Sequence, residues 1–430
     1  MKRMMIKSAS LSVALFLGYG IKAMVPMQQQ DVAARVVCGA DRLFTEYLHL
    51  VKGKKVALVA NHSALMADGT HLVDTLFART DMQLQVLFGA EFTIRSNDYS
   101  LPRDKEADVD TLTGLPKYSL YGHTHKPTRE MLGDVDVIVF DMQGVGMRFF
   151  EHVNILGFVM EAASENGIAV VVLDRPNPLA GRHVDGFVTD EEFRYSFGSY
   201  ASIPVCHGMT MAELAQLYNG TMMLRNGKPA KLQVVPMVGW QRGMWFDETG
   251  LAWKKPSPNL LYFSSILAYA GTCLFEGTNV SEGRGTDRPF EYIGAPWLHS
   301  REVVAQLQQL PLPGVVFEPL QFVPAKQSHL SKPPKYCGEP CEGIYVRVVD
   351  RDAYQPYKTG VALLWAIHKV HADSMGWKEA AIFRLAGTRR LKTMITDGHS
   401  AEAIFAAWQA EIDEFMMLRA PYLIYPERRR

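Results

Sequence analysis

The chain has 430 residues, of which 48% are hydrophobic and 21% are charged, a composition typical of a soluble globular protein with two domains. Lys plus Arg and Asp plus Glu both number 45, and no basic run is long enough to follow a phosphate backbone, which argues against a nucleic-acid partner. Of the five cysteines, only Cys337 and Cys341 lie close together. This pair suggests a local disulfide, and the lack of a second close pair argues against structural zinc.

The N-terminal residues have the pattern of a secretory signal peptide. Three basic residues precede an apolar stretch from Ala9 to Tyr19, and Ala23 supplies the small residue that signal peptidases accept. The apolar stretch is too short to span a bilayer. We therefore predict a signal peptide over residues 1–23, a periplasmic or secreted protein, and no stable membrane insertion after cleavage. A buried N-terminal helix and an uncleaved anchor are the alternatives.

Four apolar runs of strand length follow, and each ends in a polar group. Their residues do not alternate between apolar and polar, so both faces of each strand should be buried, as in a parallel sheet covered by helices. Helical stretches at 71–79, 127–132 and 152–166 separate them, which predicts an α/β fold with a Rossmann-like parallel sheet. The four runs are Val56 to Asn61, Leu84 to Glu91, Val135 to Gln143 and Ala169 to Asn177.

Polar residues at the ends of these runs are the first candidates for a site. The carboxyl ends of parallel strands meet at one edge of the sheet, where open α/β sheets bind their ligands. The candidates are Asn61, Glu91, Asp141, Gln143, Asp174 and Arg175.

A domain boundary is expected in the proline-rich segment from Lys254 to Asn259, because prolines do not fit inside a helix or a central strand. Thr210 to Asn219 before it reads as a helix with a capping box. Beyond it, a strand at 343–349 and helices at 361–371 and 401–415 predict a smaller α+β domain. We place the first domain at 38–258 and the second at 263–430.

The segment from Glu276 to Phe290 has the character of a binding loop. Its glycines let the backbone turn tightly, and its Glu, Asn and Arg side chains provide directional hydrogen bonds for sugar hydroxyls or a carboxylate. The alternative is a solvated loop with internal Arg–Glu pairs. The candidate ligand-binding residues are Glu276, Asn279, Glu282 and Arg284.

Several other side chains have both a functional and a structural interpretation. Glu91 either acts as a general acid or pairs with Arg95. Arg148 lies beyond the end of the third strand run, beside two glycines, as a ligand contact or a solvated residue. Asp174 either faces a ligand or pairs with Arg175 to close a proline-fixed turn. His207 is an acid, a base, a sugar contact or a structural histidine.

No Gly-x-Ser-x-Gly elbow, His-Glu-x-x-His motif or complete phosphate loop is present, so carboxylate chemistry is favoured and neither a cofactor nor a metal is expected. His123 and His125 lack a third metal ligand.

Together these segments resemble the exo-β-N-acetylmuramidase family typified by NamZ, also called YbbC-like and formerly a domain of unknown function. The resemblance implies a Rossmann-like catalytic domain and a smaller C-terminal domain, with the site in the cleft between them. It also implies release of N-acetylmuramic acid from the non-reducing end of peptidoglycan fragments. Its carriers are 113–116, 119–122, 173–178, 207–210, 256–259, 276–290 and 294–297.

Two motifs depart from the family pattern. Where the family usually reads Pro-Glu-His-Gly-x-Arg-Gly, the chain keeps Glu91 and Arg95 but has Phe92 in place of the histidine. A family carboxylate is replaced by Gly144. These departures motivate a rival hypothesis, a noncatalytic muropeptide-binding protein, and a weaker one, a different hydrolase built on the same cleft.

The leading hypothesis is an exported glycosidase with Glu91 as its general acid. Arg95 or Arg284 would bind the lactyl carboxylate as a bidentate pair. The second catalytic role is open between Glu282, Asp141 and the acetamido group of the substrate.

Overall fold

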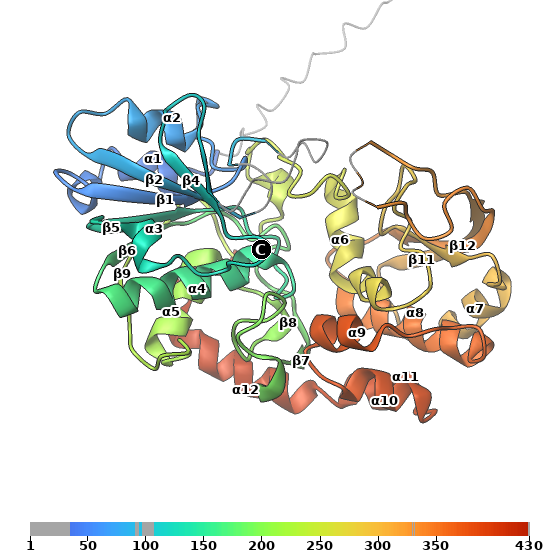
Figure 1. The fold of residues 1–430 in the computed structure, drawn as a ribbon. Helices are drawn as coiled ribbons and strands as arrows, with labels where there is room; N and C mark the ends of the chain where they lie inside the picture. The colour runs from blue at the N-terminus through green and yellow to red at the C-terminus, as the bar shows by residue number, and fades with distance from the viewer. Residues whose placement is uncertain (1–34, 91–93, 97–106, 329, 331, 429–430) are drawn as a thin grey trace, which may run out of the picture. The chain divides into compact units, whose positions relative to one another are not determined.

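The larger part of the protein is built on a seven-stranded sheet (Figure 1). The computed structural model describes residues 35–90, 94–96, 107–328, 330 and 332–428, and the predicted signal peptide lies outside them. All neighbouring strands are parallel except β3 and β4, which confirms the predicted α/β sheet. In spatial order the strands are β3 (Ala107–Val109), β4 (Pro116–Ser119), β2 (Gln83–Gly89), β1 (Lys55–Ala60), β5 (Val137–Asp141), β6 (Ala169–Leu173) and β9 (Lys231–Val235).

Helices cover both faces of this sheet, which explains why its strands are continuous apolar runs. In β5, Val137 and Val139 pack toward α1 (Gly39–Leu43) and α2 (Leu72–Phe77). Their neighbours in β5 face the opposite way, into the core formed with α4 (Glu151–Asn166) and α5 (Met211–Gly220). Figure 1 shows the two helix layers on opposite sides of the sheet. Each fully buried side chain of this size contributes roughly 1.5–3 kcal/mol.

The predicted capping box of α5 is confirmed. The Thr210 hydroxyl accepts a hydrogen bond from the backbone N–H of Glu213 at 3.3 Å, and the Glu213 carboxylate accepts one from the N–H of Thr210 at 3.0 Å. Two of the N–H groups that a helix start leaves unpaired are satisfied in this way. The beginning of α5 is therefore determined locally by its sequence.

The second part of the protein is smaller and contains an antiparallel sheet of three strands with helices beside it. Helices α6 and α8 pack with Gly271 against Gly360, where an added Cβ on Gly360 would lie 2.3 Å from the Gly271 backbone. The elements are α6 (Phe263–Thr272), β10 (Tyr292–Ala295), α7 (Ser300–Leu307), β11 (Val315–Phe322), β12 (Cys341–Val348), α8 (Pro356–His371), α9 (Glu379–Ala386) and α10 (Arg390–Thr396).

The helix expected at 401–415 is two helices, α11 (Ala401–Ala406) and α12 (Gln409–Arg419). The apolar pattern continues across the break, so periodicity alone does not reveal it. Short helices complete the description: α3 (Arg129–Leu132), η1 (Leu48–Leu50), η2 (Glu191–Phe193), η3 (Phe246–Glu248), η4 (Cys273–Gly277) and η5 (Ala420–Tyr422).

The end of the chain returns to the larger part. Helix α12 packs against β7 (Val184–Val188), which pairs with β8 (Pro204–His207) in a two-stranded antiparallel ribbon. Beyond α12, the Tyr425 hydroxyl donates a hydrogen bond to Asp174 at 2.5 Å, just past the end of β6. The boundary near residue 260 stays a prediction, and the last segment of the predicted 263–430 domain packs with the first domain.

The local disulfide that the spacing of Cys337 and Cys341 suggested is not formed, because both cysteines are free. Cys337 is exposed, whereas Cys341 is buried with its sulfur 3.7 Å from the Glu339 carbonyl oxygen. Proximity in sequence does not ensure that two Cβ atoms point toward each other.

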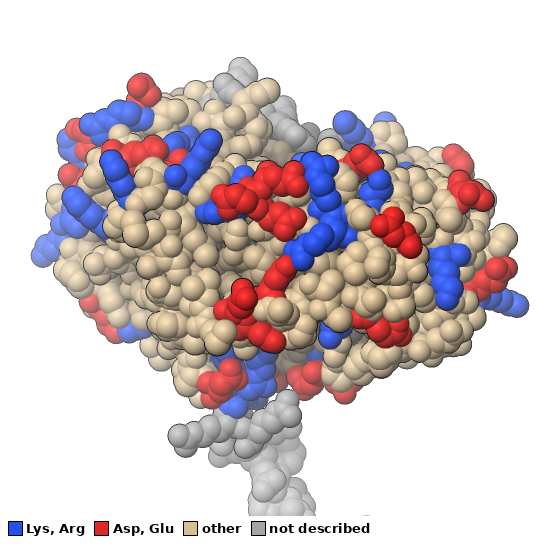
Figure 2. All heavy atoms as spheres, turned by 90° about the horizontal axis from the view of Figure 1, so that it is seen from below, with Lys and Arg blue, Asp and Glu red and all other residues tan. Residues whose placement is uncertain are grey.

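Acidic and basic side chains are interspersed on the face of the molecule that Figure 2 shows. None of the helices in the described ranges combines the length and the apolar character of a membrane span.

Candidate functional site

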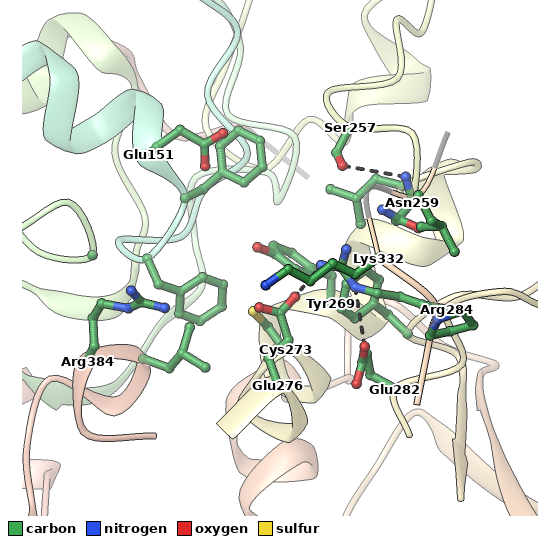
Figure 3. Close-up of a pocket in the computed structure, with 18 of the residues that line it drawn as sticks. Glu151, Ser257, Asn259, Tyr269, Cys273, Glu276, Glu282, Arg284, Lys332 and Arg384 are labelled. Atoms are coloured by element: carbon green, nitrogen blue, oxygen red, sulfur yellow. Dashed lines mark hydrogen bonds and ion pairs between the residues drawn. The ribbon is translucent and has the colours of Figure 1, made fainter. Parts of the chain in front are cut away.

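A cavity of about 400 Å³ lies where the two parts of the protein meet. One wall comes from the loop after β5 and the start of α4, and the opposite wall comes from α6, η4 and the loop that follows them (Figure 3). Chain segments far apart in sequence therefore share one pocket. Its polar and charged lining residues include Glu151, Ser257, Asn259, Tyr269, Cys273, Glu276, Glu282, Arg284, Lys332, Lys335 and Arg384.

Glu282 is the centre of a charged cluster in one wall. Its carboxylate is 2.8 Å from Lys335 Nζ and 3.3 Å from Arg284 Nε. Burial opposes its ionisation, but the charges of Lys335 and Arg284 outweigh burial and lower the pKa of Glu282. Glu282 is therefore an ionised carboxylate held in a fixed position inside the cavity.

The same cluster is tied to the loop that carries it. Lys335 Nζ donates hydrogen bonds to the carbonyl oxygens of Phe275 at 2.7 Å and Val280 at 2.8 Å. Arg284 forms a second ion pair, with Glu276, and lies over the Phe290 ring at 5.2 Å. These contacts hold both ends of the cluster, so its carboxylates are positioned before any ligand arrives.

Glu151 faces the cavity from the other wall. It is the first residue of α4, where the helix dipole favours an acidic side chain. Figure 3 shows Glu151 across the pocket from Glu276 and Glu282. Carboxylates therefore lie on both walls of the cavity.

The described lining residues include three carboxylates and four basic side chains, an excess of one positive charge that suits an anionic ligand.

Three of the predicted site residues line this cavity, namely Glu276, Glu282 and Arg284. Glu91 lies outside the described residues. Asn279 belongs to the same loop but is not among the residues lining the cavity. Its amide donates to the Ser374 carbonyl at 2.9 Å and accepts from the Gly376 N–H at 2.8 Å, so it anchors the loop.

The strand-end candidates that the structure describes lie at one edge of the sheet, but their side chains bond to the protein. Asp141 and Arg175 form a buried bidentate pair at 2.5 and 2.8 Å. Asn61 Nδ2 lies 3.1 Å from His152 Nε2. Gln143 donates to the carbonyl oxygens of Gly144 and Pro176. A second cavity, of about 320 Å³, is lined in part by Gln143 and Arg175.

The side chain of Asp174 is fully buried and is surrounded by three hydrogen-bond donors of the protein. It accepts hydrogen bonds from the Ala212 N–H at 3.0 Å, the Thr210 hydroxyl at 2.7 Å and the Tyr425 hydroxyl at 2.5 Å. Burial raises its pKa to about 7. Its place beneath the start of α5 accounts for these bonds without a ligand.

Two further candidates, Arg95 and Arg148, also have structural partners. Arg95 forms ion pairs with Asp110 and Asp74, both at 2.9 Å. Arg148 is fully buried and donates to the carbonyl oxygens of two cavity-lining residues, Gly198 at 3.2 Å and Leu385 at 3.0 Å. Burial lowers the pKa of Arg148 to about 10. Arg148 therefore stabilises two segments of the cavity wall through their backbone carbonyl groups.

His207 is buried as well. Its Nδ1 accepts a hydrogen bond from the Met209 N–H at 3.1 Å, and burial lowers its pKa to about 3. This geometry favours the structural interpretation of His207 over an acid or a base.

Sequence reasoning missed several lining residues as site candidates. Asn259 was visible in the Pro-Ser-Pro-Asn segment, a motif of the family resemblance, but the prolines were interpreted as a domain boundary. Glu151 and Lys335 carry no local signal, because only the fold brings them to the cavity. Across the described ranges, no group of three or more His, Cys, Asp or Glu residues is placed to hold a metal ion.

Comparisons with known proteins agree with this architecture. Residues 56–264 match the family model of the N-terminal domain of exo-beta-N-acetylmuramidase NamZ, and residues 267–425 match that of its C-terminal domain. Peptidoglycan beta-N-acetylmuramidase NamZ of Bacillus subtilis (strain 168) is 40% identical over 392 residues, which are 91% of this chain and 92% of the relative.

Two crystal structures of DUF1343 family proteins from Bacteroides fragilis NCTC 9343 have the same fold. The first is 30% identical with a TM-score of 0.83, and the second is 28% identical with a TM-score of 0.74. Each comparison covers 91% of this chain and 99% of the solved one. With both family models matched in order and a full-length relative at 40% identity, the chain belongs to the exo-β-N-acetylmuramidase NamZ family.

Proposed function

We propose that the protein is an exo-acting glycoside hydrolase that releases N-acetylmuramic acid from the non-reducing end of peptidoglycan fragments. The observation that carries this proposal is the cavity between the two parts, with carboxylates on both walls and one positive charge in excess. N-acetylmuramic acid is itself an anionic sugar. The Bacillus subtilis relative, named as a peptidoglycan beta-N-acetylmuramidase, supports the same reaction.

Glycoside hydrolysis needs one group that protonates the leaving oxygen and another that acts on the oxocarbenium-like centre. Glu282 suits the second role, because its lowered pKa keeps it ionised inside the cavity. Asp141 does not suit it, because the carboxylate is buried against Arg175 and does not line the cavity. Glu282 and the acetamido group of the substrate are therefore the remaining candidates for the second catalytic role. Glu91 remains the proposed acid.

Arg284 is the better of the two proposed ligands for the lactyl carboxylate. It lines the cavity, whereas the guanidinium of Arg95 is occupied by Asp110 and Asp74 and is not part of the cavity wall. Arg284 forms an ion pair with Glu276 in this structure. A bound lactyl carboxylate would therefore compete with Glu276 for the guanidinium of Arg284. Because a carboxylate binds a guanidinium through charge-assisted hydrogen bonds, this exchange favours an anionic sugar over a neutral one.

We also propose that the protein acts after export, in the periplasm or outside the cell, on disaccharides or muropeptides. The support for export is the charged and apolar pattern of residues 1–23.

The test is release of N-acetylmuramic acid from a chromogenic β-N-acetylmuramide and from a muramyl-glucosamine disaccharide. We expect the chain from Met24 onward to release it, and Glu282→Gln and Glu91→Gln to lower kcat by about 10²–10⁴-fold. Glu318→Gln, in an exposed ion pair on β11, is the matched control and should keep full activity.

Failure of the parent to release the sugar from either substrate would refute the proposal. Tight binding of the disaccharide without release would instead support the noncatalytic binding protein, which the comparisons do not favour.

A further inference from the structure

The side-chain oxygen of Asn259 is buried and has no hydrogen-bond partner in the described part of the chain. The residue is 5% exposed and lines the main cavity. Its Oδ1 accepts no hydrogen bond from any described residue. Buried polar groups in native proteins are nearly always paired, and an unpaired one keeps its full desolvation penalty. An unpaired acceptor in a cavity wall is a group that a ligand can satisfy.

The backbone around Asn259 is fixed, so the amide is held at this place. Pro256 and Pro258 flank the preceding serine and are both buried. The Leu260 N–H donates to the Ser257 carbonyl at 3.0 Å, which closes a turn around Asn259. His62 donates to the Lys255 carbonyl at 2.7 Å and so ties this segment to the loop after β1.

The residues around Asn259 indicate which hydrogen-bond donor of a muramyl sugar would bind to it. Sugar hydroxyls find charged acceptors in the three carboxylates of the cavity, because charge-assisted hydrogen bonds are the stronger ones. Asn259 offers a neutral acceptor instead, and Leu260 and Leu330 in the same lining are apolar. A neutral acceptor beside apolar side chains matches an N-acetyl group, whose N–H needs an acceptor and whose methyl group needs an apolar contact.

We propose that Asn259 is a specificity-determining residue that accepts a hydrogen bond from the N–H of the 2-acetamido group of the bound sugar. The inference rests on the proposed function, because it names a contact to the substrate of that same site. Asn259 thereby distinguishes a 2-acetamido sugar from one that has no donor at this position.

A binding cycle tests this contact. N-acetylmuramic acid and its 2-deoxy counterpart are titrated by calorimetry into the full chain and into Asn259→Ala. We expect the parent to bind the acetamido sugar about 10- to 100-fold more tightly than the 2-deoxy sugar, as a single buried hydrogen bond implies. Asn259→Ala should lose most of this preference and keep only the smaller part that the contact of the acetamido methyl group contributes. The inference is overturned if Asn259→Ala keeps the preference of the parent.

Two controls separate recognition from structure. Asn226→Ala removes an amide outside the cavity, bonded to Ser164 and Lys228, and should keep the full preference. The melting temperature of Asn259→Ala without ligand should equal or exceed that of the parent, because the Asn259 oxygen accepts no hydrogen bond from the described residues. A lower melting temperature would show a structural role and contradict the inference.

The outcomes also distinguish this inference from the proposed function. If the parent releases N-acetylmuramic acid but binds both sugars equally, the role of Asn259 is wrong and the activity stands. If the parent neither binds the sugar nor releases it, both are wrong.

Discussion

At the scale of single residues, burial decides which titratable groups change their proton affinity when the protein folds. His207 is buried near Arg419 and Arg148, two positive charges that add to the effect of burial and lower its pKa to about 3. Asp174 shows the opposite effect on an acid, with its pKa raised to about 7. Both groups are neutral in the folded protein over a pH range in which they are charged when unfolded.

His207 should make stability depend on pH. Between about pH 6.5 and 3 the unfolded chain binds a proton at this residue and the folded protein does not, so the free energy of unfolding falls by up to about 1.4 kcal/mol per pH unit as the pH is lowered. Urea unfolding at pH 7, 6 and 5 should show this loss for the parent relative to His207→Asn, which keeps an acceptor for Met209. Asp174 acts in the opposite direction from about pH 7 to 4, because there the folded protein holds the proton. Asp174 is present in both the parent and His207→Asn, so its contribution cancels in the difference between their free energies of unfolding. If that difference did not change with pH, the lowered pKa of His207 would be contradicted.

At the scale of elements, helix α5 is fixed by charges as well as by its capping box. Glu213 caps the helix and is also paired with Arg242 at 2.6 Å, with both side chains almost completely buried. Arg242 further donates to the carbonyl oxygens of Gly181 and Gly208. Removing one partner of a buried pair leaves an uncompensated charge, whereas removing both often costs little.

Glu213→Gln should therefore lower the free energy of unfolding by about 3–5 kcal/mol. Combining it with Arg242→Met should restore part of that loss, measured by urea unfolding at pH 7. Glu318→Gln, in an exposed pair with Arg347, should change stability by less than about 1 kcal/mol. Equal losses at the buried and exposed sites would show that burial is not the cause.

At the scale of the whole molecule, the two parts are joined by the last residues of the chain and by Arg148. Arg148 follows β5 and binds the carbonyl oxygen of Leu385, which lies in α9. Tyr425 binds Asp174 and accepts a hydrogen bond from the Met237 N–H at 2.9 Å. Residues more than 180 positions apart in sequence thus hold the sheet and the C-terminal segment together.

Tyr425→Phe should lower the free energy of unfolding by about 1–3 kcal/mol, because it leaves the buried Met237 N–H without its acceptor and removes a donor from Asp174. Tyr422→Phe is the control, since the Tyr422 hydroxyl has no hydrogen bond among the described residues. Both are measured by urea unfolding monitored by tryptophan fluorescence. Similar stability of the two variants would show that the last residues do not stabilise the sheet.

The sequence alone determined the parallel sheet and its helices, the capping box of α5 and the loop that supplies Glu276, Glu282 and Arg284 to the cavity wall. Those features depend on local patterns, namely apolar periodicity, capping residues and glycine spacing, which a short segment carries by itself. The tertiary structure decided which polar residues face the cavity. Asp141, Asp174 and His207 are buried against protein partners, while Glu151 and Asn259 reach the pocket, because contacts between distant segments determine whether a polar side chain faces a ligand or its own protein.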